Sequence, residues 1–381
     1  MKATRHKSNS GRARSTVPIR LLTAVPICDG HDSAINTINL EFIRHGLEVV
    51  YLGYHRSARD IVRAAIQEDV RAIGLSSYNG GHVEFFREVK ALLKKRGAAN
   101  IGLFGGGGGT ITPADSRVMQ RAGTDRIFFA GTPLEEMVSF ARQRYGRPAA
   151  KSSSAQKDAD RRLAKSLTTL ESGRPVRIPH SAVRTRIVGI TGPGGAGKTT
   201  LIDELVLRCL NANPQARLAI LSHDPSVVSA GALLGDRATM VYSQDDRVFM
   251  RSLATRGQAG GVSAATVPCL ELLRAAGFDW IFVETVGIGQ EALPFGDGLV
   301  DKTVFVMSPE YGSPLQLQKI VMLEVADVVV VNKSDVAGAK TAAAEVQQRL
   351  GARAQPASFF PTVARRHRDA GVDGLFQFLR T

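Results

Sequence analysis

The stretch Gly192-Pro193-Gly194-Gly195-Ala196-Gly197-Lys198-Thr199 decides the fold of the second half of this chain. A short β-rich segment at 186–191 precedes it, and a helical pattern begins at Lys198. The G-x-x-x-x-G-K-[ST] spacing predicts a P-loop, because its glycines let backbone N–H groups converge on phosphate oxygens at the start of a helix. We expect Lys198 to reach the β- and γ-phosphates and Thr199 to ligate Mg²⁺. The predicted phosphate contacts come from Gly192, Gly194, Gly195, Ala196, Gly197, Lys198, Thr199 and Thr200.

A second motif, Asn332-Lys333-Ser334-Asp335, follows the apolar run 328–331 and predicts the base that the P-loop domain binds. An aspartate in this position accepts hydrogen bonds from both N1–H and the exocyclic amine of guanine, whereas adenine would leave the carboxylate unpaired. Sites of this hydrogen-bonding kind discriminate by about 10⁴-fold. We therefore expect GTP and GDP as ligands, with Asn332, Lys333 and Asp335 at the base.

Three carboxylates are predicted to complete the phosphate site. Glu284 ends the apolar run 280–283, where P-loop enzymes carry the acid that orients Mg²⁺ directly or through water. Asp224 follows the run 218–222, and Asp236 lies in Leu234-Gly235-Asp236-Arg237. We expect all three to serve Mg²⁺ together with Thr199, and to act with Lys198 in hydrolysis. Isolated aspartates are more often helix caps or turn residues, which is the alternative for Asp224 and Asp236.

The first half has a different pattern, in which short apolar runs alternate with amphipathic segments over residues 20–148. Five such βα units predict a parallel doubly wound sheet, so the fold class is α/β, a flavodoxin-like (Rossmann-like) domain followed by a P-loop GTPase domain. Ligands of such sheets bind at the carboxyl ends of the strands. Asp29, Ser76 and Gly105 all fall just past predicted strand ends.

The second half resembles a known family. Its segments His223–Ser226, Gly231–Arg237, Glu284–Gln290 and Gln316–Lys319 resemble the MeaB/ArgK-like G-protein chaperones of cobalamin-dependent acyl-CoA mutases, over roughly residues 184–381. The resemblance implies that Asp224, Asp236 and Glu284 serve Mg²⁺ and hydrolysis. It also implies that Gln290 is catalytic and, with Lys319, belongs to switch segments that sense the mutase. The family continues Gly-Asp-x-x-Arg-Met, whereas Thr239 replaces that arginine here. Arg237 is the nearby cation that could compensate.

The first half resembles the cobalamin-binding domain of base-off, His-on mutases, and is most similar to the fused isobutyryl-CoA mutase type. The usual signature is D-x-H-x-x-G, then S-x-L, then a Gly-Gly run. This chain has Asp29-Gly30-His31 with Ala34 in place of the glycine, then Ser76-Ser77-Tyr78, then Gly105–Gly109. The resemblance implies that His31 ligates the cobalt of adenosylcobalamin. The cofactor-binding residues that it implies are Asp29, Gly30, His31, Asp32, Ser76, Ser77, Tyr78, Gly105, Gly106 and Gly107.

The residue types suit this chemistry. Imidazole is a good ligand for cobalt-like transition ions. A carboxylate two residues away can hydrogen-bond to the other ring nitrogen and fix its tautomer. Displacing the cofactor's own benzimidazole frees a nucleotide tail, and small residues at Ser76 and Gly105–Gly109 leave room for it beside the sheet. A lone histidine after a strand is more often a surface residue, which is the alternative for His31.

Composition divides the chain and narrows its class. We expect a basic flexible tail at 1–18, a cobalamin-binding domain at 19–148, a linker with one exposed helix at 149–183 and the G-domain at 184–381. The net charge of +14 is partly in the tail, and only 6% of residues are aromatic, so we expect no nucleic-acid partner. An organelle transit peptide is the alternative for the tail. Three scattered cysteines and short apolar runs predict a cytoplasmic protein without a membrane partner.

These features predict a GTP-hydrolysing chaperone joined to an adenosylcobalamin-binding subunit. A mutase (β/α)₈ barrel needs about 250 residues, and the two domains and the linker use the whole sequence, so we expect the catalytic subunit to be a separate chain. GTP hydrolysis would gate loading or repair of the cofactor. An adenosyltransferase is a further candidate partner, and we expect a homo-oligomer.

Two other functions stay open: a cobalamin carrier or sensor whose G-domain hydrolyses GTP poorly, and a regulatory GTPase with a degenerate front domain. The sequence also allows a fragment of a longer fused mutase.

Overall fold

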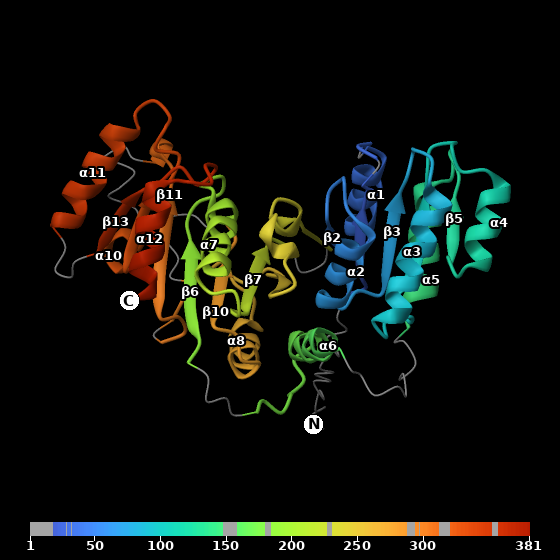
Figure 1. The fold of residues 1–381 in the computed structure, drawn as a ribbon, viewed down its shortest axis with the longest axis horizontal. Helices are drawn as coiled ribbons and strands as arrows, with labels where there is room; N and C mark the ends of the chain where they lie inside the picture. Colours follow the sequence, from blue (N-terminus) through green and yellow to red (C-terminus); the bar gives the residue numbers. More distant parts are fainter. Residues whose placement is uncertain are drawn as a thin grey trace, which may run out of the picture.

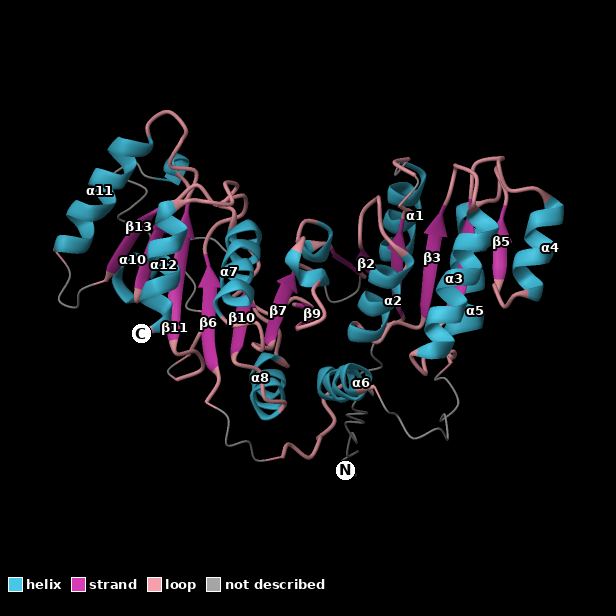
Figure 2. Cartoon of the chain, viewed as in Figure 1, coloured by secondary structure: helices cyan, strands magenta, loops and turns pink. Residues whose placement is uncertain are grey.

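A computed structural model of the chain contains two parallel β-sheets, each with helices packed on both faces (Figure 1, Figure 2). The first sheet is built mainly from the N-terminal half and the second from the C-terminal half. Both therefore confirm the expected α/β architecture. The structure describes residues 18–27, 29–31, 33–147, 158–179, 184–226, 231–287, 294–296, 298–311, 321–352 and 357–381.

The first sheet has the strand order β5-β4-β3-β1-β2-β8. Five of these strands follow the flavodoxin-like order 2-1-3-4-5, which places the ligand-binding end where the strand order reverses, beside the carboxyl ends of β1 and β3. The strands are β1 (Arg20–Ala24), β2 (Glu48–Tyr51), β3 (Ala72–Ser76), β4 (Gly102–Gly106), β5 (Arg126–Phe128) and β8 (Ala232–Leu234).

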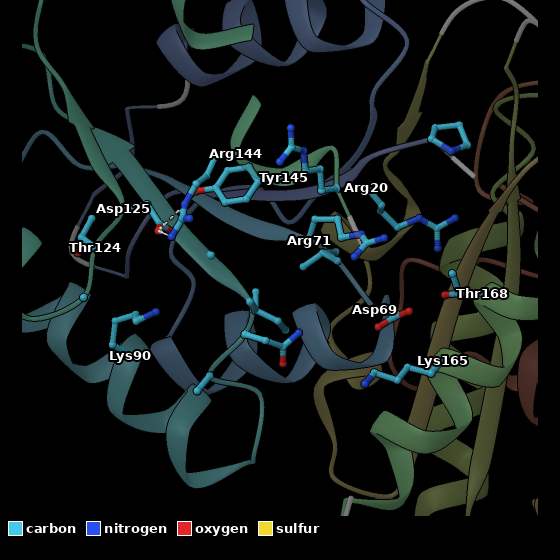
Figure 3. Close-up of a pocket in the computed structure, with 18 of the residues that line it drawn as sticks. Arg20, Asp69, Arg71, Lys90, Thr124, Asp125, Arg144, Tyr145, Lys165 and Thr168 are labelled. Atoms are coloured by element: carbon cyan, nitrogen blue, oxygen red, sulfur yellow. Dashed lines mark hydrogen bonds and ion pairs between the residues drawn. The ribbon is translucent and has the colours of Figure 1, made fainter. Parts of the chain in front are cut away.

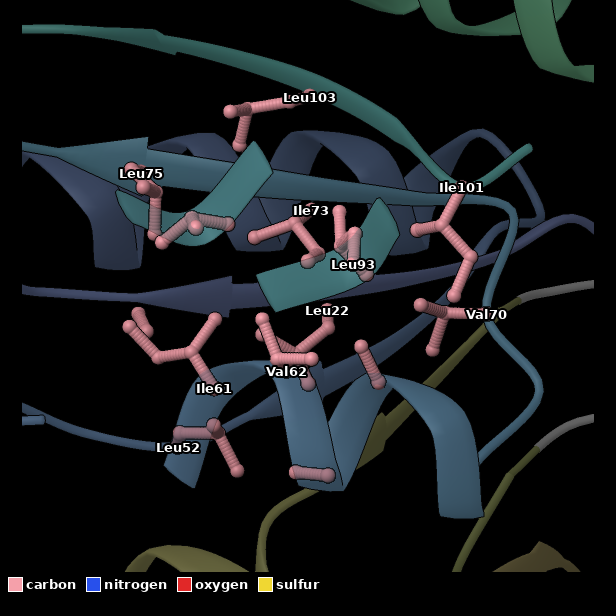
Figure 4. Close-up of a cluster of buried hydrophobic side chains, with 14 of the residues drawn as sticks. Leu22, Leu52, Ile61, Val62, Val70, Ile73, Leu75, Leu93, Ile101 and Leu103 are labelled. Atoms are coloured by element: carbon pink, nitrogen blue, oxygen red, sulfur yellow. The ribbon is translucent and has the colours of Figure 1, made fainter. Parts of the chain in front are cut away.

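Helices bury both faces of this sheet. On one face α2 and α3 pack against alternate strand residues such as Leu22 and Ile73, as Figure 4 shows. On the other face α1 and α5 cover Leu21 and Val49. The strands are consequently apolar on both sides, which is typical of parallel sheets. The helices are α1 (Ser33–Arg44), α2 (Ala58–Gln67), α3 (His82–Lys95), α4 (Pro113–Arg121) and α5 (Leu134–Tyr145).

The second sheet has the order β13-β12-β11-β6-β10-β7-β9, with the strand that leads into the P-loop at its centre. Its core includes the run Val328–Val331, whose four side chains are completely buried. Its strands are β6 (Arg186–Thr191), β7 (Leu218–Asp224), β9 (Val248–Ala254), β10 (Trp280–Glu284), β11 (Lys302–Met307), β12 (Val328–Val331) and β13 (Ser358–Pro361). Its helices are α7 (Lys198–Ala212), α8 (Thr266–Ala275), α10 (Met322–Val325), α11 (Ala339–Gly351) and α12 (Ala370–Arg380).

Strand β8 crosses the domain division expected at residue 184. It pairs in parallel with β2, with Glu48 opposite Ala232 and Val50 opposite Leu234. Ala232 and Leu234 are buried in the core between the first sheet and α2. A segment expected to belong to the G-domain therefore forms the edge of the first sheet.

The helix expected in the linker forms as α6 (Ala159–Glu171), but the expectation that it is exposed is wrong. Ala164, Leu167 and Leu170 are buried in one core cluster with α8 and the second sheet. Because these residues are three apart, they lie on one face of the helix and bury together. The same helix also packs against α2 of the first domain.

A buried ion network joins the two sheets where α6 meets them. Glu171 accepts from Arg20 of β1 at 2.8 Å and from Nε of Arg251 of β9 at 3.0 Å. Glu48 of β2 accepts from Arg20 and from Arg256, both at 2.8 Å. Burial alone would raise the pKa of Glu171, but Arg20 and Arg251 lower it. Arg20 also pairs with Glu68 at 3.7 Å, so these buried charges link strands of both sheets with α6.

Candidate functional sites

The P-loop has the backbone geometry that its sequence predicts. Gly192, Gly195 and Gly197 all have positive φ. A Cβ on Gly192 would come within 1.9 Å of the Val306 carbonyl oxygen, and one on Gly197 within 2.3 Å of Nδ2 of Asn332. Side chains are therefore excluded at both positions, and the backbone N–H groups stay accessible to an anion at the start of α7.

The buried Lys198 side chain lies along this loop, as expected for a phosphate-binding lysine. Its ammonium donates to the carbonyl oxygens of Gly192 at 3.0 Å and Pro193 at 3.2 Å. Burial lowers the pKa of Lys198, while Glu284 and Asp236 oppose that effect. The charge is thus held among neutral carbonyls, from which it can turn to phosphate oxygens.

Asn332 connects the base-binding motif to the P-loop. Its Nδ2 donates to the Ala196 carbonyl oxygen at 2.9 Å, and its Oδ1 accepts from Thr362 and from the backbone N–H of Ala364. The sequence reasoning missed Thr362 and Ala364, which follow β13. The signal available was a run of small residues directly after the strand that neighbours β12.

The aspartate expected to recognise guanine is engaged with an arginine. Arg365, which is largely exposed, donates to Asp335 at 2.5 Å and keeps its pKa below the usual value. Lys333, two residues earlier in the motif, has φ of 57°, a left-handed backbone conformation that is rare for residues other than glycine. The carboxylate is ionised, as an acceptor for two guanine N–H groups must be.

Three carboxylates gather beside the P-loop as predicted. Glu284 accepts from the Thr199 hydroxyl at 2.7 Å, and the Ser222 hydroxyl donates to Asp236 and, at 3.5 Å, to Glu284. Asp224 lies close by, with Oδ2 buried and unpartnered among the described residues. Burial and mutual repulsion raise the pKa of Asp224 well above its usual value and that of Glu284 to about 8.

This cluster fits a hydrated divalent cation better than a cation held by protein alone. No three His, Cys, Asp or Glu side chains in the described parts of the chain stand close enough to hold a metal ion together. Mg²⁺ in phosphate-transfer sites keeps several waters and needs only one or two protein ligands beside the phosphates. Thr199 and the carboxylates whose pKa values are raised satisfy that requirement. Oδ2 of Asp224, which has no partner among the described residues, is one oxygen that could face such an ion.

His223, next to Asp224 in sequence, has a structural role. Its ring nitrogens bond to the Glu284 carbonyl oxygen at 2.7 Å and to the Thr266 hydroxyl at 2.8 Å. Complete burial lowers the pKa of His223 to about 4, so the ring is neutral. It ties β7, β10 and α8 together behind the carboxylates.

The loop after Asp236 is bound to the first domain. Arg237 points away from the phosphate site and donates to Glu68 at 3.1 Å, to Gln67 and to the Met250 carbonyl oxygen. The expectation that Arg237 could compensate for the arginine replaced by Thr239 is therefore wrong. Its buried guanidinium is already satisfied at the end of α2.

Arg56 extends this connection toward the other candidate site. Its guanidinium donates to the Ala238 carbonyl oxygen and to that of Leu52, both at 2.6 Å. Its backbone N–H donates to the Val25 carbonyl oxygen, at the start of the loop that carries His31. The two residues that follow Asp236, Arg237 and Ala238, are therefore both bonded to the first domain.

In that loop Asp29 and His31 are paired as predicted. Oδ1 of Asp29 accepts from Nδ1 of His31 at 2.8 Å and from the His31 backbone N–H at 3.0 Å. Oδ2 accepts from the backbone N–H groups of Tyr78 and Asn79, which follow β3. The His31 side chain is 64% exposed. The buried carboxylate thus fixes the Nδ1–H tautomer and leaves Nε2 for a ligand on the solvent side.

Glycines in the last part of β4 and directly after it let this strand come close to the end of β3. A Cβ on Gly105 would lie 2.4 Å from the Leu75 carbonyl oxygen, and one on Gly107 only 1.7 Å from that of Ser77. Gly106 accepts from the Ser77 backbone N–H at 2.9 Å. No larger residue could occupy these positions without moving β3.

Beside these glycines an apolar slot of about 300 Å³ opens between the sheet and helices α1 and α5. Ser76, Tyr78 and Gly105–Gly108 line it, and so does Thr23, whose hydroxyl is buried without a partner among the described residues. The Tyr78 ring lies 5.4 Å from the His31 ring, so the slot begins next to the exposed imidazole. A flat apolar group with a few polar atoms fits here, which is the chemistry of a benzimidazole tail.

Some of the predicted site residues lie outside the part of the chain that the structure describes. Asp32, Gln290 and Lys319 are not among the described residues, nor is the tail up to residue 17. Among the helices that are described, none combines the length and apolar character needed to cross a bilayer.

Comparisons with known proteins match both halves. Residues 163–380 match the family model described as methylmalonyl Co-A mutase-associated GTPase MeaB, and residues 19–138 match the model described as B12 binding domain. Both matches agree with the two motif sets and with the resemblances drawn from them.

Two similar proteins each match almost the whole of this chain, including both halves. Fused isobutyryl-CoA mutase of Cupriavidus metallidurans is 39% identical over 390 residues, which cover 95% of this chain and 35% of that protein. The protein of the same name from Geobacillus kaustophilus is 37% identical over 393 residues, covering 94% and 36%. The chain therefore spans about a third of the length of these relatives.

Proposed function

Because this chain belongs to the family of methylmalonyl-CoA mutase-associated GTPases and carries a B12-binding domain in front of its GTPase domain, we propose that it couples GTP hydrolysis to the handling of adenosylcobalamin. The recipient of the cofactor would be an acyl-CoA mutase. The proposal of a mutase partner rests on the names of the fused relatives.

The observation that carries the proposal is the segment 231–238, which belongs to both sites. Asp236 contributes to the carboxylate cluster beside the P-loop, β8 before it is a strand of the cobalamin-binding sheet, and Arg237 after it is buried against Glu68. A movement of Asp236 between GTP and GDP states would therefore be transmitted to the cobalamin-binding domain. Such a shared element can bias two sites at once, as allosteric coupling requires.

In the nucleotide site each residue has a proposed part. Lys198 would bind the β- and γ-phosphates, and Thr199 would hold Mg²⁺, which neutralises charge on the phosphates when bound. Asp224, Asp236 and Glu284 would position waters around that ion and the attacking water. Asn332, Lys333 and Asp335 would hold guanine, with Asp335 released by Arg365. Gln290 stays a predicted catalytic residue.

In the front domain, His31 Nε2 would ligate the cobalt of a base-off cobalamin, while Asp29 keeps the ring in the required tautomer. The bound cofactor supplies a cobalt–carbon bond that can be cleaved homolytically for a mutase. The slot beside Gly105–Gly108 would bury the detached nucleotide tail. This chain's contribution is thus to hold, orient and release the cofactor.

The proposal is tested by an absorption titration with adenosylcobalamin. The wild-type chain should give a saturable base-off spectrum, and His31→Ala should lose histidine ligation. His45→Ala, at the end of α1, is the matched control and should bind as the wild type does. If His31→Ala still held the cofactor with histidine on cobalt, the assignment of the ligand would be wrong.

A cobalamin carrier with a poorly hydrolysing G-domain is the second candidate, and one observation favours it. Thr239 stands where the family has an arginine. Its hydroxyl donates to the Asp236 carbonyl oxygen, while Arg237 is bonded to Glu68. Steady GTP turnover that Lys198→Ala abolishes would exclude this candidate. GTP binding without turnover would establish it.

A further inference from the structure

A cavity of about 1100 Å³ lies away from both candidate sites, between the first sheet and α6 (Figure 3). Arg20 at the start of β1, Gly102 at the start of β4 and Asp125 before β5 line it. All strands of this sheet are parallel, so their starts are at the edge opposite to the one that bears His31. The cavity therefore belongs to neither the cobalamin slot nor the P-loop.

Positive charge dominates the walls of this cavity. Eight arginine and lysine side chains line it, against the two carboxylates of Asp69 and Asp125. Asp125 is already paired with Arg144 at 2.7 Å, an interaction drawn in Figure 3. Arg20 and Arg251 are neutralised by buried glutamates. The other five cations have no carboxylate partner among the described residues.

Two of these unpartnered cations are partly removed from water. Lys90 comes from α3 and Lys165 from α6, so they approach the cavity from the two parts of the chain that meet there. Burial lowers the pKa of Lys90 and of Lys165. Arg161 adds to the effect on Lys165, while Asp125 raises the pKa of Lys90 and Asp69 that of Lys165, which offsets burial only in part. Withdrawing an unpaired ammonium group from water costs free energy. Partly buried cations without a bonded carboxylate are typical of sites that bind an oppositely charged ligand.

We propose that this cavity binds a small anion with several phosphate groups, either a free polyphosphate or the phosphate chain of a nucleotide. Lysine ammonium groups and arginine guanidinium groups are the side chains that bind phosphate oxygens in proteins. Small-molecule sites have volumes of roughly 300–1000 Å³, so the cavity is large enough for either ligand. A monoanion would leave most of the surrounding positive charge unpaired, which favours a polyvalent ligand.

The position of the cavity gives the ligand a way to act on the rest of the protein. Arg20 and Arg251 form part of its wall, and both pair with Glu171 in the network that joins the two sheets. Phosphate groups in the cavity would compete with Glu171 for these guanidinium groups. The bound anion would therefore lie directly against the junction of the domains.

The test uses the full chain saturated with GDP, so that the P-loop cannot bind the probe. Tripolyphosphate and ATP are titrated separately by calorimetry at about 50 and about 200 mM salt, and binding should weaken with salt. The variant Lys90→Gln/Lys165→Gln should bind at least about tenfold more weakly, since each lysine supplies a charged contact. The matched control Lys94→Gln/Lys95→Gln changes two exposed lysines of α3 that do not line the cavity, and should bind normally.

The two probes also identify the source of the phosphates. Equal affinity for tripolyphosphate and ATP would assign the site to the phosphate chain alone, and tighter binding of ATP would assign it to a nucleotide. Absence of binding by either probe, or equal weakening in the control variant, would overturn the proposal. Unchanged GDP affinity in each variant shows that the fold is intact.

Discussion

The Asp29→Asn substitution should weaken cobalamin binding without touching the predicted cobalt ligand. Asp29 accepts four N–H groups, two from His31 on Oδ1 and two from Tyr78 and Asn79 on Oδ2. An asparagine has one acceptor oxygen, so either pair of donors must face its NH₂ group. A hydrogen bond to a charged acceptor contributes about 1.5–3 kcal/mol, so losing two costs roughly 3–6 kcal/mol in this loop.

Part of this cost will appear as altered loop structure and part as weaker ligation. Removing the partner of a metal-bound histidine typically lowers metal affinity about 10–100-fold, and we expect the Kd for adenosylcobalamin to rise by that factor. The assay is the absorption titration, in which His31→Ala sets the weakest binding expected. Glu88→Gln on α3, the same carboxylate-to-amide change at an exposed position, is the control. A Kd within about twofold of wild type would refute the reasoning.

Three further predictions concern the G-domain and the domain junction. Gly197→Ala should abolish GDP binding measured by fluorescence, since its Cβ would meet Asn332 at 2.3 Å in a left-handed conformation; retained binding would contradict this. The pKa of Glu284 is about 8 in the folded state and lies above its unfolded value. Without Mg²⁺ the folded protein therefore binds more protons than the unfolded chain, and its free energy of unfolding should fall as pH rises toward 8. Stabilisation by Mg²⁺·GDP in thermal melts should consequently be larger at about pH 8.5 than at about pH 6, and Glu284→Gln should reduce this difference. Glu171→Gln should lower the free energy of unfolding, measured in urea, by about 3–5 kcal/mol, because it leaves Arg251 buried without its carboxylate. As the control, Glu324→Gln removes one partner of an exposed ion pair and should cost at most about 1 kcal/mol. Equal effects would show that the buried network contributes no more than a surface pair.

The sequence alone located the two candidate sites to a large extent. The P-loop, the Asn332–Asp335 motif and the Asp29–His31 pair each lie within a few residues of chain, so their geometry follows from local backbone rules and from the strand that precedes them. The strands themselves were predictable because parallel strands are apolar on both faces, as Val328–Val331 illustrates.

Tertiary structure decided what those sites are attached to. Arg237 could be read as a cation for the phosphate site until its guanidinium was seen to pair with Glu68, about 170 residues earlier in the chain. Likewise β8 is a short apolar segment whose partner strand, β2, no local pattern specifies, because an open sheet edge accepts any suitably shaped strand.

The cavity beside α6 likewise depends on tertiary structure. Lys90 and Lys165 belong to different helices, and each reads in sequence as an ordinary surface lysine of an amphipathic helix. Only the packing of α6 against the first domain brings their charges to one cavity and removes them partly from water. Local interactions therefore specified the motifs, while long-range contacts between elements specified how the two halves are joined and where charge accumulates between them.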